Sequence, residues 1–136
     1  MTDMAPTPTT DTRADFERLL GELYAARVAG TLEPLCALFA PDAFFRISGS
    51  SDGKPIALSA RGGTQVRSWL AVLVKTFRIS RHEILSTVID GPRAAVHWRA
   101  SIDSRITGAS VATELIDLVE MREGLIGSYV ELFVPA

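Results

Sequence analysis

The sequence contains little cysteine and histidine and no long hydrophobic run. Its single cysteine, Cys36, excludes an internal disulfide, and its place in a short apolar segment predicts a core position. The two histidines, His82 and His97, lack a metal-ligand spacing, so we expect neither a metal site nor a cofactor. The longest apolar run, within residues 70–74, is far shorter than the roughly 20 residues of a transmembrane helix, so we expect no association with a membrane.

Clusters of basic residues are also absent. The formal net charge is -2 at pH 7, and the arginines are scattered along the chain. Because nucleic-acid binding depends on groups of lysine and arginine that meet phosphates, we expect no nucleic-acid partner. Residues 1–11 lack the basic start and apolar stretch of a signal peptide, so they are predicted to be a disordered tail of a cytoplasmic protein. The remaining residues, 12–136, are long enough for one domain with one core.

Three segments in the first half of the chain have the apolar spacing of amphipathic helices. Residues 12–28 form the first, and Gly30 ends it. The second is short and is predicted to break at residues 40–42, because Pro41 restricts the residue before it, and a strand is expected at 43–47. The third begins near Thr64. Between the strand expected at 43–47 and the third helix, residues 48–63 are rich in glycine and serine. They are predicted to be a flexible loop with one short strand at 56–59.

The second half of the chain is predicted to form β-strands. Four segments, residues 82–89, 93–102, 110–121 and 125–134, are separated by turns that contain Gly91, Gly108 or Gly124. Helices followed by an antiparallel meander are typical of the α+β class. Since 47% of the residues are hydrophobic, we expect apolar surface beyond the core, which would line a cavity, form a subunit interface, or both.

Two sequence motifs resemble those of a known family. The N-terminal motif comprises residues 29–32 and 37–43, and the C-terminal motif comprises residues 113–118 and 129–133. With them, the chain resembles the SnoaL-like and ketosteroid isomerase-like members of the nuclear transport factor two-like superfamily. The resemblance implies that residues 12–136 form a SnoaL-like domain, a cone-shaped curved antiparallel sheet wrapped around three N-terminal helices. It also implies a homodimer that pairs through the outer face of the sheet.

The resemblance also predicts a cavity inside the cone. Strand alternation puts Leu115, Asp117 and Val119 on one face, and matching to ketosteroid isomerase turns that face inward. A mostly apolar wall with a few polar groups suits a small hydrophobic molecule. The predicted ligand-binding residues are Tyr24, Phe45, Ile47, Trp69, Trp98, Leu115, Val119, Tyr129 and Phe133.

Asp117 is the leading catalytic candidate. In the steroid isomerases, a carboxylic acid at the matching position is kept protonated by apolar surroundings and donates a hydrogen bond to a developing oxyanion. Glu131 or His82 is the expected proton partner, so the predicted catalytic residues are Asp117, Glu131 and His82. The alternative is structural, with Asp117 paired to a buried arginine such as Arg27 or Arg46.

The sequence also departs from the isomerase pattern. The position of the general base corresponds to Ile47, and the position of the oxyanion tyrosine corresponds to Leu23. Tyr24 is one residue away, which rotates it by about 100° around the helix. Three hypotheses of function therefore stay open. The first is a cofactor-free isomerase, lyase or cyclase that acts on a small hydrophobic substrate. The second is a non-catalytic small-molecule binding module, and the third is a dimeric protein-interaction domain.

Overall fold

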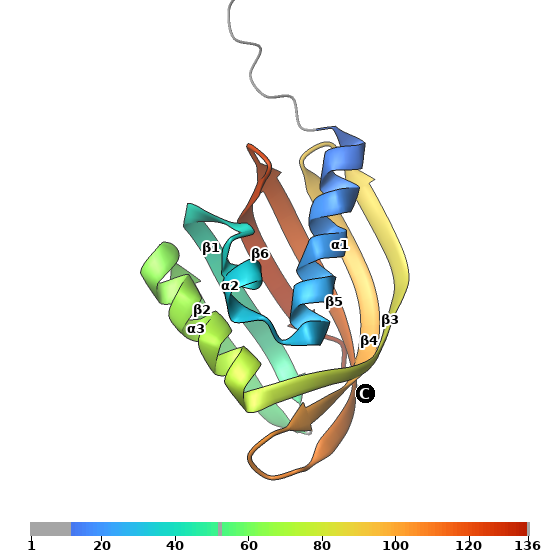
Figure 1. Cartoon of the computed structure of the whole chain (residues 1–136). Coiled ribbons are helices and arrows are strands. Elements are labelled where there is room, and N and C mark those ends of the chain that lie inside the picture. The colour runs from blue at the N-terminus through green and yellow to red at the C-terminus, as the bar shows by residue number, and fades with distance from the viewer. Residues whose placement is uncertain (1–11, 52, 136) are drawn as a thin grey trace, which may run out of the picture.

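The computed structural model describes residues 12–135 except residue 52, so the predicted tail, residues 1–11, lies outside the described residues. The elements, drawn in Figure 1, are the helices α1 (Arg13–Ala29), α2 (Leu32–Cys36) and α3 (Gly63–Thr76) and the strands β1 (Phe39–Ser51), β2 (Lys54–Arg61), β3 (Phe77–Asp90), β4 (Arg93–Ser104), β5 (Ser110–Arg122) and β6 (Leu125–Phe133). No helix among these residues is long and apolar enough to cross a membrane.

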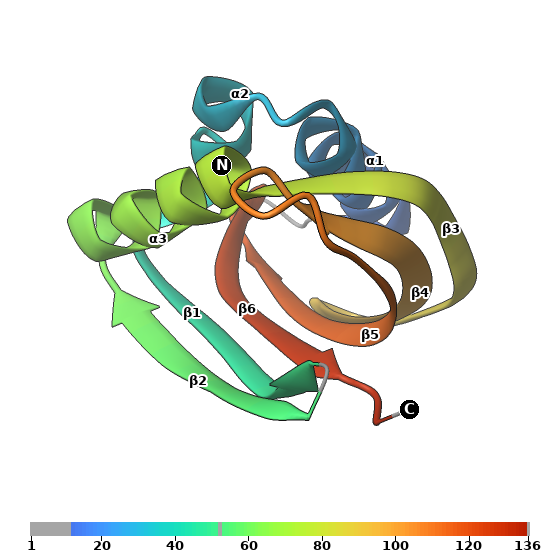
Figure 2. The ribbon, with the colours of Figure 1, turned by 90° about the horizontal axis from the view of Figure 1, so that it is seen from below.

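The strands form one six-stranded sheet in the order β2-β1-β6-β5-β4-β3. The sheet is strongly curved and does not close, and the helices lie on its concave side (Figure 2). The predicted α+β cone is therefore confirmed, as is the meander from β3 to β6. One detail differs from the expected antiparallel sheet, because β1 pairs with β6 in parallel.

Helix α1 has well-defined ends. At its start, the Thr12 hydroxyl accepts a hydrogen bond from the Asp15 N–H at 3.1 Å, and the Asp15 carboxylate accepts one from the Thr12 N–H at 2.9 Å. At its end, Gly30 adopts a left-handed conformation with φ of 70°. The helix buries Phe16 and Leu23 completely against the concave face of the sheet. These caps and this apolar face fix where the inward side chains of α1 lie.

Three predicted boundaries were wrong. Helix α2 ends at Cys36 rather than at Pro41, and β1 begins at Phe39 and contains Pro41. The pairing of β1 with β6 is irregular between Phe39 and Phe44, so a proline without an N–H is tolerated there. Strand β3 begins at Phe77, five residues before the predicted start at His82.

The segment 48–63 was also predicted wrongly as an irregular excursion with one short strand. The end of β1 pairs with β2 as an antiparallel hairpin, with register from Phe44↔Arg61 to Ser51↔Lys54. The inward residues of β2 alternate with exposed ones, and Ala60 is buried. This alternation, which is typical of a half-buried strand, outweighs the glycine and serine content.

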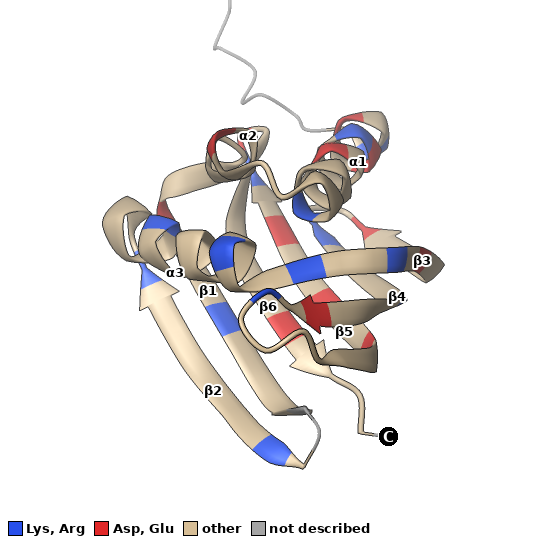
Figure 3. Ribbon diagram, turned by 60° about the horizontal axis from the view of Figure 1, so that its bottom comes forward, with Lys and Arg blue, Asp and Glu red and all other residues tan. Residues whose placement is uncertain are grey.

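Charged residues are distributed over all parts of the fold. Figure 3 shows acidic and basic residues interspersed along the helices and strands. This distribution is in line with the small net charge of the chain. Two carboxylates differ from the rest, because Asp117 and Glu131 are the buried charged residues of the described chain. They define the candidate site.

Candidate functional site

Asp117 lies on β5 inside the cone, with no exposed surface. Its Oδ2 atom accepts three hydrogen bonds, from the Tyr24 hydroxyl at 2.6 Å, from Trp98 Nε1 at 2.7 Å and from the Tyr129 hydroxyl at 2.8 Å. These donors come from α1, β4 and β6. Three consecutive strands and the N-terminal helix α1 therefore meet at one carboxyl oxygen.

The other oxygen of Asp117, Oδ1, is buried and has no hydrogen-bond partner among the described residues. Complete burial and then the charge of Glu131 raise the pKa of Asp117 to about 8, against the opposing effects of Arg27 and of the hydrogen bonds from Tyr24 and Tyr129. Because Oδ2 is already occupied by three donors, the proton of the neutral acid is on Oδ1. The site therefore holds an acid proton that has no acceptor among the described residues.

Arg27 neutralises the second buried carboxylate. Its Nη1 atom donates to Glu131 Oε2 at 2.8 Å and to the Tyr129 hydroxyl at 2.6 Å, and its Nη2 atom donates to Glu131 Oε1 at 3.3 Å. Burial alone would lower the pKa of Arg27, but the charge of Glu131, the neighbouring Tyr129, the hydrogen bond to Glu131 and the charge of Asp117 together outweigh it and hold that pKa well above its ordinary value. The alternative in which Arg27 or Arg46 pairs with Asp117 was wrong, since Arg27 binds Glu131 and the Arg46 Nε atom donates to Ser48.

The two tyrosines are held as neutral donors. Burial raises the pKa of Tyr24, and the neighbouring Asp117 raises it further. Burial likewise raises the pKa of Tyr129 well above its ordinary value. Both hydroxyls therefore keep their protons at neutral pH and continue to donate to Asp117.

His82 completes the cluster from β3. Its ring stacks on Tyr24 with a centroid distance of 5.3 Å and lies 5.2 Å from the Trp98 ring. The residue is half-buried, and its Nε2 atom is buried without a partner among the described residues. Burial and then the charge of Arg27 lower the pKa of His82, so the imidazole is neutral at pH 7.

Comparison with known proteins shows which family the chain belongs to. The model of the SnoaL-like domain matches residues 20–129, most of the chain. The chain belongs to the SnoaL-like family. A comparison with curated proteins finds no match.

Solved structures agree on the fold of this SnoaL-like chain. An NTF2-like protein from Burkholderia xenovorans is 21% identical over 91% of this chain and 92% of its own, with a TM-score of 0.74. An LEH-like epoxide hydrolase from M. tuberculosis is 14% identical, with coverage of 89% and 84% and a TM-score of 0.69. A protein with a ketosteroid isomerase-like fold from Catenulispora acidiphila, in complex with trimethylamine, is 16% identical, with coverage of 83% and 82% and a TM-score of 0.69. At these identities the likeness concerns the fold alone.

The residues predicted to bind a ligand lie in two environments in the SnoaL-like domain. Those packed in the core are Tyr24, Phe45, Ile47, Trp98, Leu115, Val119 and Tyr129. Phe133 is half-buried at the end of β6, and Trp69 is 37% exposed on α3. The structure brings Tyr24, Trp98 and Tyr129 directly to Asp117, whereas Trp69 and Phe133 make no polar contact with it.

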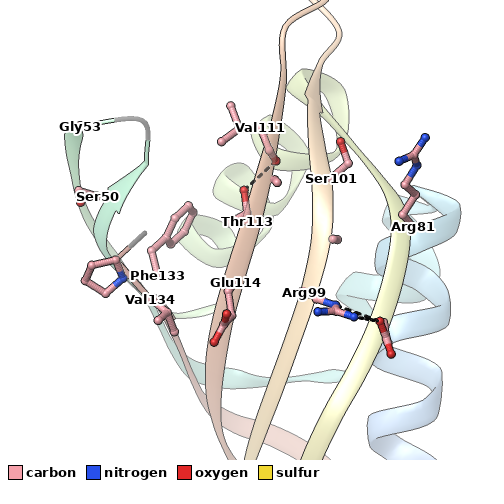
Figure 4. A pocket seen from close by; sticks show the side chains of 14 residues that line it. Ser50, Gly53, Arg81, Arg99, Ser101, Val111, Thr113, Glu114, Phe133 and Val134 are labelled. Carbon is pink, nitrogen blue, oxygen red and sulfur yellow. Dashed lines mark hydrogen bonds and ion pairs between the residues drawn. The ribbon is translucent and has the colours of Figure 1, made fainter.

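The hollows of the described surface lie away from Asp117. One of about 860 Å³, drawn in Figure 4, lies between the β1–β2 turn, the end of β6 and strands β3 to β5, with Arg81, Arg99, Thr113 and Phe133 among its lining. Two others, of about 350 and 430 Å³, lie over the outer face of the sheet and beside α1. None of the three is lined by Asp117, Tyr24 or Trp98. A ligand in any of these three hollows would therefore not contact Asp117.

Sequence reasoning missed two features of the site. It placed Tyr24 out of phase for an oxyanion tyrosine, yet the Tyr24 hydroxyl lies 2.6 Å from Asp117. It also predicted Glu131 as a proton partner of Asp117 and did not predict its pairing with Arg27. Tyr24 and Arg27 are three residues apart, a spacing that puts them on one face of a helix, and this signal was available in the sequence.

Proposed function

We propose that the protein is an enzyme that acts on a small hydrophobic molecule by acid–base catalysis, as an isomerase, lyase or cyclase. The observation that supports this most is the state of Asp117, a fully buried carboxyl with three donors on one oxygen and no partner on the other. A carboxyl held as a neutral acid near pH 7 can donate its proton to an oxygen on which negative charge develops. Chemistry of this kind requires only the side chains of the site.

The contacts suggest a role for each member of the cluster. Tyr24, Trp98 and Tyr129 fix the orientation of Asp117, so that Oδ1 and its proton point away from them. The Glu131 carboxylate is bound by Arg27 through both oxygens, which disfavours it as a proton acceptor. His82, with a neutral imidazole and a buried Nε2, is the better proton partner. The substrate is a small, mainly apolar molecule because the surrounding side chains are aromatic or aliphatic.

Exchange of acidic C–H protons tests this proposal. Cyclohexanone and 2-tetralone incubated in D₂O with the protein should gain deuterium beside the carbonyl, as measured by NMR. Asp117→Asn should slow this exchange by about 100-fold or more, since a positioned acid contributes at least that much. Asp90→Asn, the same change at an exposed position, is the control and should leave the rate unchanged. Exchange that persists in Asp117→Asn would contradict the proposal.

A second candidate is a non-catalytic binding module of the same fold. It is favoured by the packing of the interior, where Arg27 and Glu131 form a closed ion pair and the described hollows do not reach Asp117. Such a module binds an apolar molecule without turning it over. Binding of 2-tetralone without deuterium incorporation would support this candidate over the enzyme.

The outer face of the sheet supports a further proposal, a homodimer. Alternation places apolar and charged side chains together there: His97, Arg99, Ser101, Glu114, Ile116, Leu118, Glu120, Val130 and Leu132. Leu118 is 44% exposed beside a hollow of about 350 Å³ that Val88 and Val130 also line. A patch that mixes aliphatic area with charge is typical of subunit interfaces.

We therefore expect the protein to sediment as a dimer at micromolar concentration and Leu118→Arg to sediment as a monomer, because a buried unpaired charge disrupts the contact. Ile106→Arg, at a turn position that is 79% exposed, should stay dimeric. A wild-type protein that sediments as a monomer would refute the dimer.

A further inference from the structure

Two buried side-chain atoms of the described chain have no hydrogen-bond partner, and both belong to the same cluster. They are Asp117 Oδ1 and His82 Nε2. The two side chains flank one pair of aromatic residues. Tyr24 donates to Asp117 while its ring stacks on His82, and Trp98 on β4 also donates to Asp117 while its ring lies tilted beside His82. Buried polar atoms are nearly always paired, so two unpaired atoms at one cluster point to a ligand.

The backbone of β3 is distorted where it supplies His82. Ser80 pairs with Ser101 and Glu83 pairs with Arg99, so two residues, 81 and 82, lie opposite one residue of β4. In a regular strand, position 82 would face outward with Arg99. The extra residue of the bulge turns His82 into the cone instead.

Arg81 carries the strain of this bulge. Its φ is 53°, in the left-handed region that side chains other than glycine rarely adopt. Strained residues of this kind cluster at functional sites, where the surrounding structure holds them in place. The strain therefore accompanies the inward placement of His82 and of its unpaired nitrogen.

We propose that Asp117 Oδ1 and His82 Nε2 together bind one oxygen atom of the substrate, with Arg81 as the positioning residue for His82. This inference rests on the proposed function and narrows its substrate to a neutral, mainly apolar molecule with a single hydroxyl group, which includes the enol form of a ketone. The acid proton on Oδ1 donates to that oxygen, and Nε2, as the acceptor nitrogen of the neutral imidazole, accepts the hydroxyl proton. The faces of Tyr24 and Trp98 supply apolar contact.

The other charges near the cluster fit a neutral ligand. Arg27 lies 5.6 Å above the Trp98 ring and is already paired with Glu131 through both carboxylate oxygens. Neither charge is left to bind an ionic group. Since His82 is the half-buried member of the cluster, the ligand enters on its side.

Binding of phenol and toluene, which have nearly the same shape, measures the contribution of one oxygen. The readout is the shift of the Trp98 indole N–H signal in NMR titrations. The wild-type protein should bind phenol about tenfold more tightly than toluene, the value of roughly one hydrogen-bonded group. His82→Phe keeps an aromatic ring but lacks Nε2, so it should lose most of this preference while still binding toluene.

The positioning role of Arg81 has its own pair of variants. Arg81→Gly can adopt the left-handed conformation and should keep the preference for phenol, whereas Arg81→Val resists that conformation and should lose it. Equal binding of phenol and toluene by the wild-type protein, or no binding of either, would overturn the inference. A preference that Asp117→Asn abolishes but His82→Phe retains would also overturn it. If Asp117→Asn still stops the deuterium exchange of ketones in that case, the proposed function stands without the role of His82.

Discussion

Arg27→Met is expected to lower the free energy of unfolding by about 3–5 kcal/mol, the usual effect of removing one partner of a buried ion pair. The side chains of Arg27 and Glu131 are only 10% and 2% exposed, so the substitution leaves a carboxylate in the interior without a cation. It also removes the donor at 2.6 Å from the Tyr129 hydroxyl. Urea unfolding followed by tryptophan fluorescence measures the change.

The double variant Arg27→Met with Glu131→Gln separates the ion pair from simple loss of packing. Removing both charges leaves no isolated charge, so most of the lost stability should return. Arg122→Met, at an exposed arginine that pairs with Asp42 on the surface, is the matched control and should change the unfolding free energy little. A double variant as unstable as Arg27→Met would mean that the arginine stabilises the protein by packing alone.

The stability of the wild-type protein should fall relative to Asp117→Asn as the pH rises from about 4 to about 8. The folded protein holds the proton of Asp117 up to a pKa of about 8, whereas the unfolded chain releases it near the ordinary value of 3.8. Below the unfolded pKa both states are protonated and the carboxyl has no net effect. Between the two values unfolding releases a proton, so the free energy of unfolding decreases by up to about 1.4 kcal/mol per pH unit.

Asp117→Asn lacks this proton release and keeps an oxygen acceptor for Tyr24, Trp98 and Tyr129. Its melting temperature should therefore approach that of the wild type with rising pH and exceed it near the upper end of the range. Asp90→Asn should follow the wild-type curve, because that carboxyl is exposed. A wild-type protein that gains stability over Asp117→Asn with rising pH would show that the carboxyl is ionised and structural, and the acid role proposed for it would fail.

The sequence predicted those parts of the fold that local patterns encode. Helical spacing located α1, and glycines at 91, 108 and 124 marked the turns of the meander. Strand alternation also put Leu115, Asp117 and Val119 on one face, and all three are buried. Each of these features depends on residues that are close together in the chain.

Features that depend on pairing across the sheet could not be predicted in this way. The composition of residues 48–63 is that of a loop, but the segment is held as a hairpin because the end of β1 supplies its hydrogen-bond partners. Pro41 is a helix breaker in isolation, and here it lies in a strand at an irregularity of the pairing between β1 and β6.

The candidate site shows the same limit. Periodicity gives the direction of a helix face but not the width of the surface that a concave sheet covers. Leu23 and Tyr24 are 0% and 4% exposed, so a turn of about 100° between neighbours did not carry Tyr24 out of the interior. The pairing of Arg27 with Glu131 depends on how α1 crosses β6, which no local pattern reports.

The position of β6 in the sheet has a consequence for how the chain is made. It is the last of the six strands in sequence, yet it lies between β1 and β5 and joins the two halves of the sheet. Until it emerges from the ribosome, β1 and β2 can form only an isolated hairpin, and the edge of β5 stays open. Glu131, the partner of Arg27, also arrives with β6. The domain should therefore complete its core only after β6 has been synthesised, so its nascent chain should depend on chaperones more than that of a domain whose strands pair in order of synthesis.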